Sequence, residues 1–588
     1  GQIRMDNLHL DETAKELRQM IAQGKVMGEK YWVAVTNPPY MRGSGMSNLL
    51  STYVKGNFID SKNDLFSIFI EKCENFIYKN GYQAMITQQS WMFLTGYEKL
   101  RNKMNRMNTV NLLHLGAHAF EEIGGDIVQT VTFVKVNSCL DNRVGKYFRL
   151  ITPTSQQGKE DYFLAKKNIY FITNEKFLSI PGKRIVYWLN SDLLWNQKKI
   201  SNSFISGGRN KTHNNEKYVR EWWEVVLSSK WIFYINGGNY RKWYGNLQEV
   251  VDWTDSAKSE YASHGGLVDE RNTESYGISW NGICGDLYGF RLKPPRLPYS
   301  SSSPTIVSNQ SSELYAVLGF LNTVVSHNIL SALNPTLQLN VGEVLDSPME
   351  LPEDCEEIET LSKKCVEIAK KEWDCFETSN DFEKHPLVKS ITSSCHCSTK
   401  KFVIEKAYQY WSDECDRRFN QLKANEEKLN RIFIDVYGLW DELTPDVENK
   451  DVTLRCANLQ RDIKSLLSYF IGCMFGRYSL DTEGLAYAGG EWDDTKYKRF
   501  KPDADNTIPI TDEEYLEDDI ISRLCTWLKV VYGEETLEVN LDFIAEALGN
   551  KGNTSREVIR NYFLNDFFKD HCQTYSVTGS GKRPIYWL

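Results

Sequence analysis

The sequence predicts an α/β protein that begins with a partial Rossmann-like sheet and continues into an α+β region and a mainly helical region. Three observations support this prediction. A β-branched and aromatic run, Tyr31 to Val35, stops at two consecutive prolines. An amphipathic helical pattern starts at Asp64. Further apolar runs then alternate with helical patterns, which is typical of a doubly wound sheet.

The elements of the first part are placed by their periodicity. Residues 7–27 carry a helical pattern, with Asp11 as a plausible N-cap for a helix through Gln23. The pattern from Asp64 continues to the turn Asn80-Gly81. The remaining pattern predicts strands at 82–87, 111–115 and 127–136 and a helix at 97–105.

A rigid polar turn, Asn37-Pro38-Pro39-Tyr40, ends the first apolar run. Tyr31 to Val35 reads as a buried parallel strand, and it must stop because neither proline can donate to a sheet ladder. The turn is then expected at the carboxyl end of a strand, where open α/β sheets bind their ligands.

The groups of this turn suit work on an amino nitrogen. The side-chain oxygen of Asn37 and the carbonyl of Pro38 offer two acceptors to the two hydrogens of an exocyclic amine, and the proline rings hold them in place. Tyr40 adds an aromatic face on which an extruded base can stack. The alternative is an ordinary strand-to-turn junction, because a short motif is a hypothesis until its context agrees.

Composition bounds the class of protein. A chain of 588 residues suggests three or four domains at roughly 150 residues each. The net charge of -9 argues against a protein that coats nucleic acid, although a local basic face stays open. Thirteen scattered cysteines, no signal peptide and no apolar run of about 18 residues favour free thiols in a reducing cytoplasm and no membrane.

Both ends of the chain suggest a fragment. The first residue is Gly1, and the last residues, Ile585 to Leu588, form an apolar run that would need partners. We expect five regions: a partial sheet domain at 1–150, a connector at 151–199, an α+β domain at 200–350, a helical region at 351–480 and a helix-rich, truncated region at 481–588.

Basic and aromatic residues gather between positions 198 and 242. This stretch contains nine basic and three acidic residues, with tryptophans, tyrosines and Gly-rich turns between them. Basic side chains on such loops can neutralise phosphates, and Asn and Arg can read base edges. The predicted DNA contacts are Arg209, Lys211, Asn214, Lys217, Arg241 and Lys242. The alternative is that the tryptophans are core and the charges a solvated face.

The later regions carry fewer signals. Alternation of Leu337, Leu339 and Val341 predicts a strand, and residues 361–369 and 411–433 have helical spacing. Cys395-His-Cys397 lacks the spacing of a zinc knuckle, so no metal site is expected. Gly579-Ser-Gly-Lys582 lacks the spacing of a phosphate loop. The acidic residues after Gly489 do not form a nuclease arrangement.

The order of motifs in the first part resembles that of N6-adenine DNA methyltransferases of the γ arrangement. Asn37 to Tyr40 is followed by Asp64-Leu-Phe66, Met85-Ile-Thr-Gln-Gln-Ser-Trp91 and Leu115-Gly-Ala-His-Ala-Phe120. Phrases along the whole chain are similar to the PglX methyltransferases of bacterial BREX phage-defence systems, among them 61–66, 89–94, 238–245, 472–480, 562–571 and 582–587.

This resemblance implies roles for individual residues. Asn37, Pro38, Pro39 and Tyr40 would be the catalytic turn that holds a flipped adenine. Phe120 would be a second aromatic against that base, and Leu65 and Phe66 would border the adenine ring of S-adenosylmethionine. For all three of these side chains, a place in the core is the alternative.

The resemblance also implies a function with one part missing. The implied activity is site-specific N6-adenine DNA methylation, with double-stranded DNA and other defence-system proteins as partners and the region 200–350 as a target-recognition domain. The Gly-rich donor motif that should precede Asn37 is absent, so we expect this fragment to bind S-adenosylmethionine poorly and to be inactive alone. The rival functions are a restriction-modification enzyme with a fused nuclease and a non-catalytic DNA-recognition or assembly component.

Overall fold

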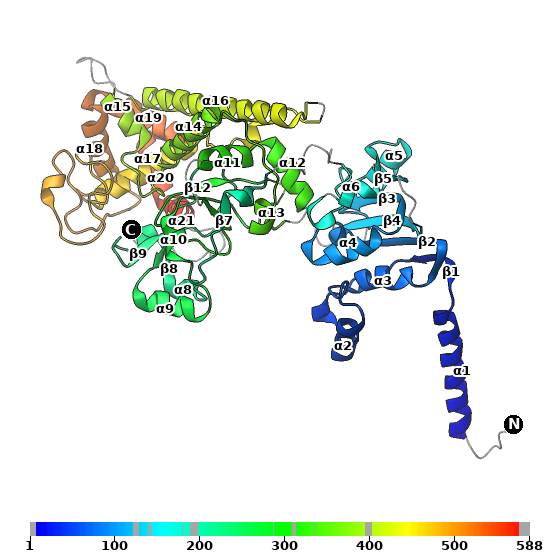
Figure 1. Ribbon diagram of the computed structural model, residues 1–588. Helices are drawn as coiled ribbons and strands as arrows, with labels where there is room; N and C mark the ends of the chain where they lie inside the picture. Colours follow the sequence, from blue (N-terminus) through cyan, green and yellow to red (C-terminus); the bar gives the residue numbers. More distant parts are fainter. Residues whose placement is uncertain are drawn as a thin grey trace. The chain divides into compact units, whose positions relative to one another are not determined.

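The computed structural model describes residues 8–120, 129–138, 143–178, 180–188, 198–285, 287–308, 313–334, 337–393, 403–440 and 442–575. The chain divides into two compact units, and the elements of each can be followed in Figure 1. The first is Gly1–Lys198 with Ile329–Pro335 and Asp346–Pro348, and the second holds the remainder.

A six-stranded sheet organises the first unit, in the order β1-β2-β4-β3-β5-β6. β1 pairs parallel with β2 and β3 with β5, whereas β4 is antiparallel to β2 and β3, and β6 to β5. The predicted α/β class is confirmed as a mixed sheet with helices. The strands are β1 (Tyr31–Thr36), β2 (Ile77–Gln88), β3 (Asn108–Gly116), β4 (Thr130–Val136), β5 (Val144–Arg149) and β6 (Ile169–Thr173).

Helices connect these strands. They are α1 (Leu8–Gly28), α2 (Asn48–Asn57), α3 (Leu65–Glu74), α4 (Glu98–Met104), α5 (Gln156–Leu164) and α6 (Asn174–Leu178). α3 has an N-cap, because the side chain of Asp64 accepts a hydrogen bond from the Phe66 amide. Its buried face includes Phe66, Ile70 and Cys73.

Two helix boundaries differ from the prediction. α1 begins at Leu8, so Asp11 lies inside the helix rather than at its N-cap. α3 ends at Glu74, and the residues from Ile77 to Asn80 belong to β2. Apolar spacing placed Ile77 on a helix because short apolar runs fit a helix and a strand equally well.

The second unit contains two small antiparallel sheets, β8-β10-β9 and β12-β11-β13-β7. The predicted strand at 337–341 is wrong: Gln338 makes a single bridge to Ile283, and α13 starts at Val341. The strands are β7 (Phe204–Ser206), β8 (Val219–Glu221), β9 (Trp231–Tyr234), β10 (Glu249–Asp252), β11 (Gly277–Ser279), β12 (Arg291–Lys293) and β13 (Thr305–Ser308).

Most of the second unit is helical. Its helices include α8 (Asn215–Tyr218), α9 (Asp255–Ser263), α10 (Glu270–Glu274), α11 (Leu314–Leu321), α13 (Val341–Leu345), α14 (Glu356–Trp373), α15 (Pro386–Ser393), α16 (Ile404–Tyr437), α17 (Leu459–Met474), α18 (Ile520–Tyr532), α19 (Leu537–Leu548), α20 (Ser555–Asn565) and α21 (Phe567–Tyr575). The helix α12 (Val324–Leu333) belongs to this unit up to Asn328. The helices expected around 361–369 and 411–433 are confirmed as parts of α14 and α16.

The core of this helical part is built on α17. Leu466 and Phe470 are buried there together with Trp527 of α18 and Ile544 of α19. Within the described ranges, no one helix is both long and apolar enough to cross a bilayer, and α11 with α12 meet that test only as a pair bent by 74°.

Candidate functional site

β1 delivers the Asn37-Pro38-Pro39-Tyr40 turn to the carboxyl end of the parallel pair β1 and β2, where Thr36 is in register with Met85. The strand itself is not buried, although the sequence suggested that it would be. It is the first strand in the order of the sheet, and Val33 and Val35 are 52% and 73% exposed. The β-branched run therefore correctly indicated a parallel strand but not its surroundings.

Within the described part of the chain, the two predicted acceptors have no hydrogen-bond donor from the protein. Asn37 is exposed, while Pro38 is buried and Pro39 exposed. Among the described residues, no hydrogen bond to the Asn37 carboxamide or to the Pro38 carbonyl oxygen is formed. A ligand amine could therefore use both acceptors without displacing an internal hydrogen bond.

Tyr40 is half-buried and belongs to a short aromatic stack. Its ring meets the ring of Phe66 edge to face at 6.1 Å, and Phe66 in turn lies 5.9 Å from Tyr97. Burial, with the nearby Asp64 carboxylate, raises the pKa of Tyr40 to about 12. The phenol is therefore uncharged at neutral pH, and the ring can act as an apolar face.

The structure corrects the expectation that Phe66 borders the adenine ring of S-adenosylmethionine. Phe66 is 0% exposed, so its ring supports Tyr40 from within the core and cannot face a ligand. Leu65 is half-buried and keeps an accessible edge. Phe120 is also half-buried and lies just after β3, beyond Gly116 with its positive φ of 66°.

The described residues do not fit a complete S-adenosylmethionine site. Such a site needs a strand followed by a Gly-rich turn that lets the backbone approach the ligand. Before β1 the described chain is the helix α1, from Leu8 to Gly28, whose described side chains are nearly all exposed. The part of the chain that the structure describes therefore contains the Asn37–Tyr40 turn but no Gly-rich turn for a donor.

A buried hydrogen-bond network around His114 was missed by the sequence analysis. His114 on β3 lies with Nε2 2.6 Å from Oε1 of Gln89 and Nδ1 3.1 Å from the Tyr187 hydroxyl. Gln89 also donates from Nε2 to Gln129. Burial lowers the pKa of His114 to about 3, so its ring is neutral. The Gln-Gln-Ser-Trp phrase was the only sequence signal for this network.

Four of the predicted DNA contacts lie on accessible surface of the second unit. Arg209 and Lys217 are exposed and Lys211 is half-buried. Asn214 is exposed and caps α8, because its Oδ1 accepts from the Lys217 amide at 3.0 Å. The three positive charges remain available to a phosphate backbone.

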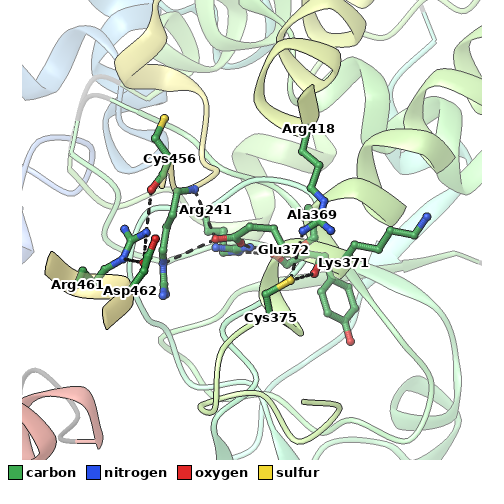
Figure 2. A network of polar contacts seen from close by, with 11 residues as sticks. Arg241, Ala369, Lys371, Glu372, Cys375, Arg418, Cys456, Arg461 and Asp462 are labelled. Carbon is green, nitrogen blue, oxygen red and sulfur yellow. Dashed lines mark hydrogen bonds and ion pairs between the residues drawn. The ribbon is translucent and has the colours of Figure 1, made fainter. Parts of the chain in front are cut away.

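The other two predicted DNA contacts are corrected by the structure, because Arg241 and Lys242 are buried. Figure 2 shows Arg241 directed at Glu372 of α14, with which it forms an ion pair. Lys242 pairs with Glu426 of α16 at 2.8 Å. Both cations therefore hold their loop to helices. Basic composition alone could not distinguish such pairs from phosphate contacts.

The aromatic residues of this region are mostly core. Trp222, Trp223 and Trp243 are at most 9% exposed, as the alternative interpretation expected. Other residues of this region line a polar cavity of about 640 Å³, among them Asn236, Asn246 and Gln248. The amide groups of these side chains were not singled out by the sequence.

Two further segments singled out in the sequence cannot be placed. Cys395-His-Cys397 and Gly579 to Lys582 lie outside the described residues. Within the described ranges, no group of three or more His, Cys, Asp or Glu side chains is arranged to hold a metal ion.

Comparison with known proteins agrees with the motifs. Residues 3–120 match the family described as Eco57I restriction-modification methylase. Over 97% of its length, the chain is 39% identical to the adenine-specific methyltransferase PglX of Lacticaseibacillus casei (strain Zhang), of which it covers 50%. It is 31% identical over 98% of its length to the adenine-specific methyltransferase BrxX of Escherichia coli O9:H4 (strain HS), again covering 50%.

Likeness to solved structures is weaker. The Type IIL restriction-modification enzyme MmeI in complex with DNA aligns with a TM-score of 0.44 at 12% identity, over 70% of this chain and 55% of that one. This value is too low to carry an argument. The chain spans about half the length of the curated relatives it matches. It is thus similar, along nearly its whole length, to half of the adenine-specific methyltransferases PglX and BrxX, which confirms the resemblance read from its motifs.

Proposed function

We propose that this protein serves in site-specific methylation of the N6 amino group of adenine in double-stranded DNA, within a BREX phage-defence system. Its turn Asn37–Tyr40 would hold the target base. The observation that carries this proposal is the pair of acceptors on Asn37 and Pro38, which no described donor uses, at the carboxyl end of β1. The similarity to adenine-specific methyltransferases supports it.

The chemistry of the turn is positioning. Asn37 Oδ1 and the Pro38 carbonyl each accept one hydrogen of the adenine amine, which turns the nitrogen lone pair toward an incoming methyl group. Tyr40 stacks on the extruded base, and Phe120 provides a second aromatic contact. Neutral acceptors suffice because holding the reactants in line can supply a large share of the rate acceleration. S-adenosylmethionine is the donor that the family implies, and the described residues account for the acceptor half of the reaction.

The test is Asn37→Ala in the protein as the cell makes it. Tritiated S-adenosylmethionine and long unmethylated duplex DNA of mixed sequence report methyl transfer, and sequencing for N6-methyladenine reports the site. Methylation should fall below detection while DNA affinity changes by less than about threefold, since the turn contributes positioning more than affinity. Asn57→Ala is the matched control, because its exposed carboxamide donates to Tyr53 within α2.

Two results would reject the proposal. One is methylation that survives Asn37→Ala at the rate of the control. The other is a loss of DNA binding that parallels the loss of methylation, which would mean that the turn serves the fold or the interface instead.

DNA recognition is proposed for the second unit. Arg209, Lys211 and Lys217 would neutralise phosphates, and Asn214 would approach a base edge with its amide. Arg241 and Lys242 are no longer included, because each is paired with a buried carboxylate.

A second candidate function is a DNA-recognition or assembly component that leaves catalysis to another partner. The observation in its favour is that the described residues form no complete donor site. Isothermal titration of S-adenosylmethionine into the protein as the cell makes it separates the two. Saturable binding supports a catalyst, and no heat at millimolar donor supports the binding component.

A further inference from the structure

Asp64 is a buried carboxylate that joins the Asn37–Tyr40 turn to helix α3. It is 3% exposed. Its Oδ1 atom accepts a hydrogen bond from the amide of Met41 at 2.9 Å and from the amide of Phe66 at 3.4 Å. Met41 directly follows Tyr40, and Phe66 is the second residue of α3. One oxygen atom therefore connects the end of the turn to the first turn of the helix.

Backbone contacts around Asp64 make this connection a short antiparallel pairing. The Leu65 amide donates to the Met41 carbonyl at 3.0 Å, and the Gly43 amide donates to the Asn63 carbonyl at 3.2 Å. Arg42 and Asp64 form an isolated antiparallel bridge between these two contacts. The residues directly after the turn are thus paired with the residues that begin α3.

Asp64 itself is fixed from the helix side. Its carbonyl oxygen accepts from the Ser67 hydroxyl at 2.6 Å and from the Ile68 amide at 3.3 Å. Rigid support of this kind is what positions a reactive group, because a displacement of about 1 Å can lower a rate about 10²-fold.

The amides that Asp64 binds, those of Met41 and Phe66, also lie next to an aromatic contact, because Met41 follows Tyr40 and Phe66 contacts the Tyr40 ring. Phe66 presents its buried ring to Tyr40 at 6.1 Å, edge to face. Fixing the Met41 and Phe66 amides to one atom therefore fixes the ring of Tyr40 relative to the acceptors of Asn37 and Pro38.

We propose that Asp64 is a positioning residue for methyl transfer, holding the turn so that the two acceptors and the Tyr40 ring meet the same adenine. This inference rests on the proposed function and names a residue that acts through the turn without touching the base. A single Oδ1 atom accepts the hydrogen bonds from both amides. An asparagine at this position can supply the same atom.

The experiment uses the protein as the cell makes it, long unmethylated duplex DNA and tritiated S-adenosylmethionine. Asp64→Ala should lower kcat about 10²-fold with the KM for DNA changed by less than about threefold, since positioning and not binding is lost. Asp64→Asn should restore kcat to within about fivefold of the unmodified protein, because the acceptor is restored. Lys62→Ala, at an exposed neighbouring position, is the control and should be unchanged.

A further variant separates positioning from helix capping. Asp64→Ser keeps an N-cap oxygen for α3 but is too short to reach both amides, so the protein should stay folded and still lose kcat. This variant also serves if Asp64→Ala fails to fold. In a Tyr40→Ala background, Asp64→Ala should lower kcat by a much smaller factor than it does alone, because both changes disturb the same arrangement.

Three outcomes would overturn the inference: a folded Asp64→Ala or Asp64→Ser protein with unchanged kcat, no rescue by Asp64→Asn, or full additivity with Tyr40→Ala. The proposed function fails separately, through Asn37→Ala. If Asn37→Ala abolishes methylation and Asp64→Ser leaves kcat unchanged, only the role of Asp64 is rejected.

Discussion

The Nζ atom of Lys242 lies 2.8 Å from Oε2 of Glu426, a carboxylate 184 residues further along the chain. The indole nitrogen of Trp243 donates to the other oxygen of Glu426 at 2.7 Å. Although burial opposes a charge on Lys242, the surrounding Glu426, Tyr240 and Asp451 together outweigh it and raise the pKa of the ammonium group. The loop at Lys242 and Trp243, which the sequence suggested as a DNA contact, is therefore held to α16 by a buried ion pair and a hydrogen bond.

Lys242→Met should destabilise the second unit by about 3–5 kcal/mol, because removing one partner leaves the Glu426 charge buried and uncompensated. Urea unfolding followed by tryptophan fluorescence measures this change. Lys217→Ala, which removes an exposed lysine, should stay within about 0.5 kcal/mol. If Lys242→Met instead leaves stability unchanged and weakens DNA binding in a salt-dependent way, Lys242 is a phosphate contact after all.

Replacing Arg209, Lys211 and Lys217 together by alanine should weaken DNA binding without affecting its sequence preference. Each phosphate contact contributes about 0.9 to the slope of log K against log salt, so the triple variant should lower the slope by about 2 to 3. Fluorescence anisotropy of a labelled duplex between about 50 and 200 mM salt measures it. Lys258→Ala, in a pair with Asp255 on α9, is the control. An unchanged slope would place the DNA elsewhere on the protein.

The sequence predicted well where the signal is local. Two prolines after a β-branched run must end a strand, so the residues alone place the Asn37–Tyr40 turn at a strand end. The helix starting after Asp64 was predicted for a similar reason, because its apolar spacing lies within one short segment. By contrast, the hydrogen bond that Asp64 accepts from the Met41 amide joins residues 23 positions apart. No periodicity in the sequence predicts such a contact.

Charge was the least reliable signal. Arg241 and Lys242 look no different in sequence from Lys217, yet their partners lie 131 and 184 residues away on α14 and α16. Whether a basic residue faces solvent or a buried carboxylate depends on tertiary packing. The exposure of β1 could not be predicted either, because a β-branched run has the same composition at the centre of a sheet and at its edge.

Tyr40→Phe should keep nearly full methylation, whereas Tyr40→Ala should lower kcat/KM about 10- to 100-fold. The hydroxyl lies 3.5 Å from the Ile86 carbonyl, which is at the limit of a hydrogen bond and contributes little. Loss of the ring removes base stacking, which is worth about 1–3 kcal/mol. Steady-state methyl transfer measures both variants. Equal losses in the two would assign the role to the hydroxyl.

His114 should make the first unit less stable in acid. Its pKa is lowered to about 3, first by burial and then by the charges of Arg149 and Lys159, so the folded state resists protonation. The unfolded state takes up a proton below about pH 6.5, so stability is present above that pH and is lost as pH falls toward 3, at about 1.4 kcal/mol per pH unit. His114→Gln should flatten this part of the pH–stability curve. An unchanged acid slope in the variant would mean that His114 does not titrate on unfolding.

Glu377 should produce the opposite pH dependence in the second unit. Its carboxylate accepts hydrogen bonds from Tyr575 of α21 and Ser468 of α17, so it anchors the last described helix. Burial raises the pKa of Glu377 to about 7, and the hydrogen bonds from Tyr575 and Ser468 only partly oppose this. The folded state therefore keeps a proton that the unfolded state releases above about pH 4.5.

The contribution of Glu377 to stability is fully present below about pH 4.5 and is lost as the pH rises through 7. The total loss in free energy of unfolding is about 3 kcal/mol. Glu377→Gln keeps the shape and removes the titration, so the variant should lose less stability than the unmodified protein between pH 5 and 8. The neighbouring His571, whose pKa burial lowers to about 4, titrates in both proteins and cancels from the difference. Urea unfolding at several pH values measures the difference, and parallel curves would show that Glu377 is already ionised in the folded protein.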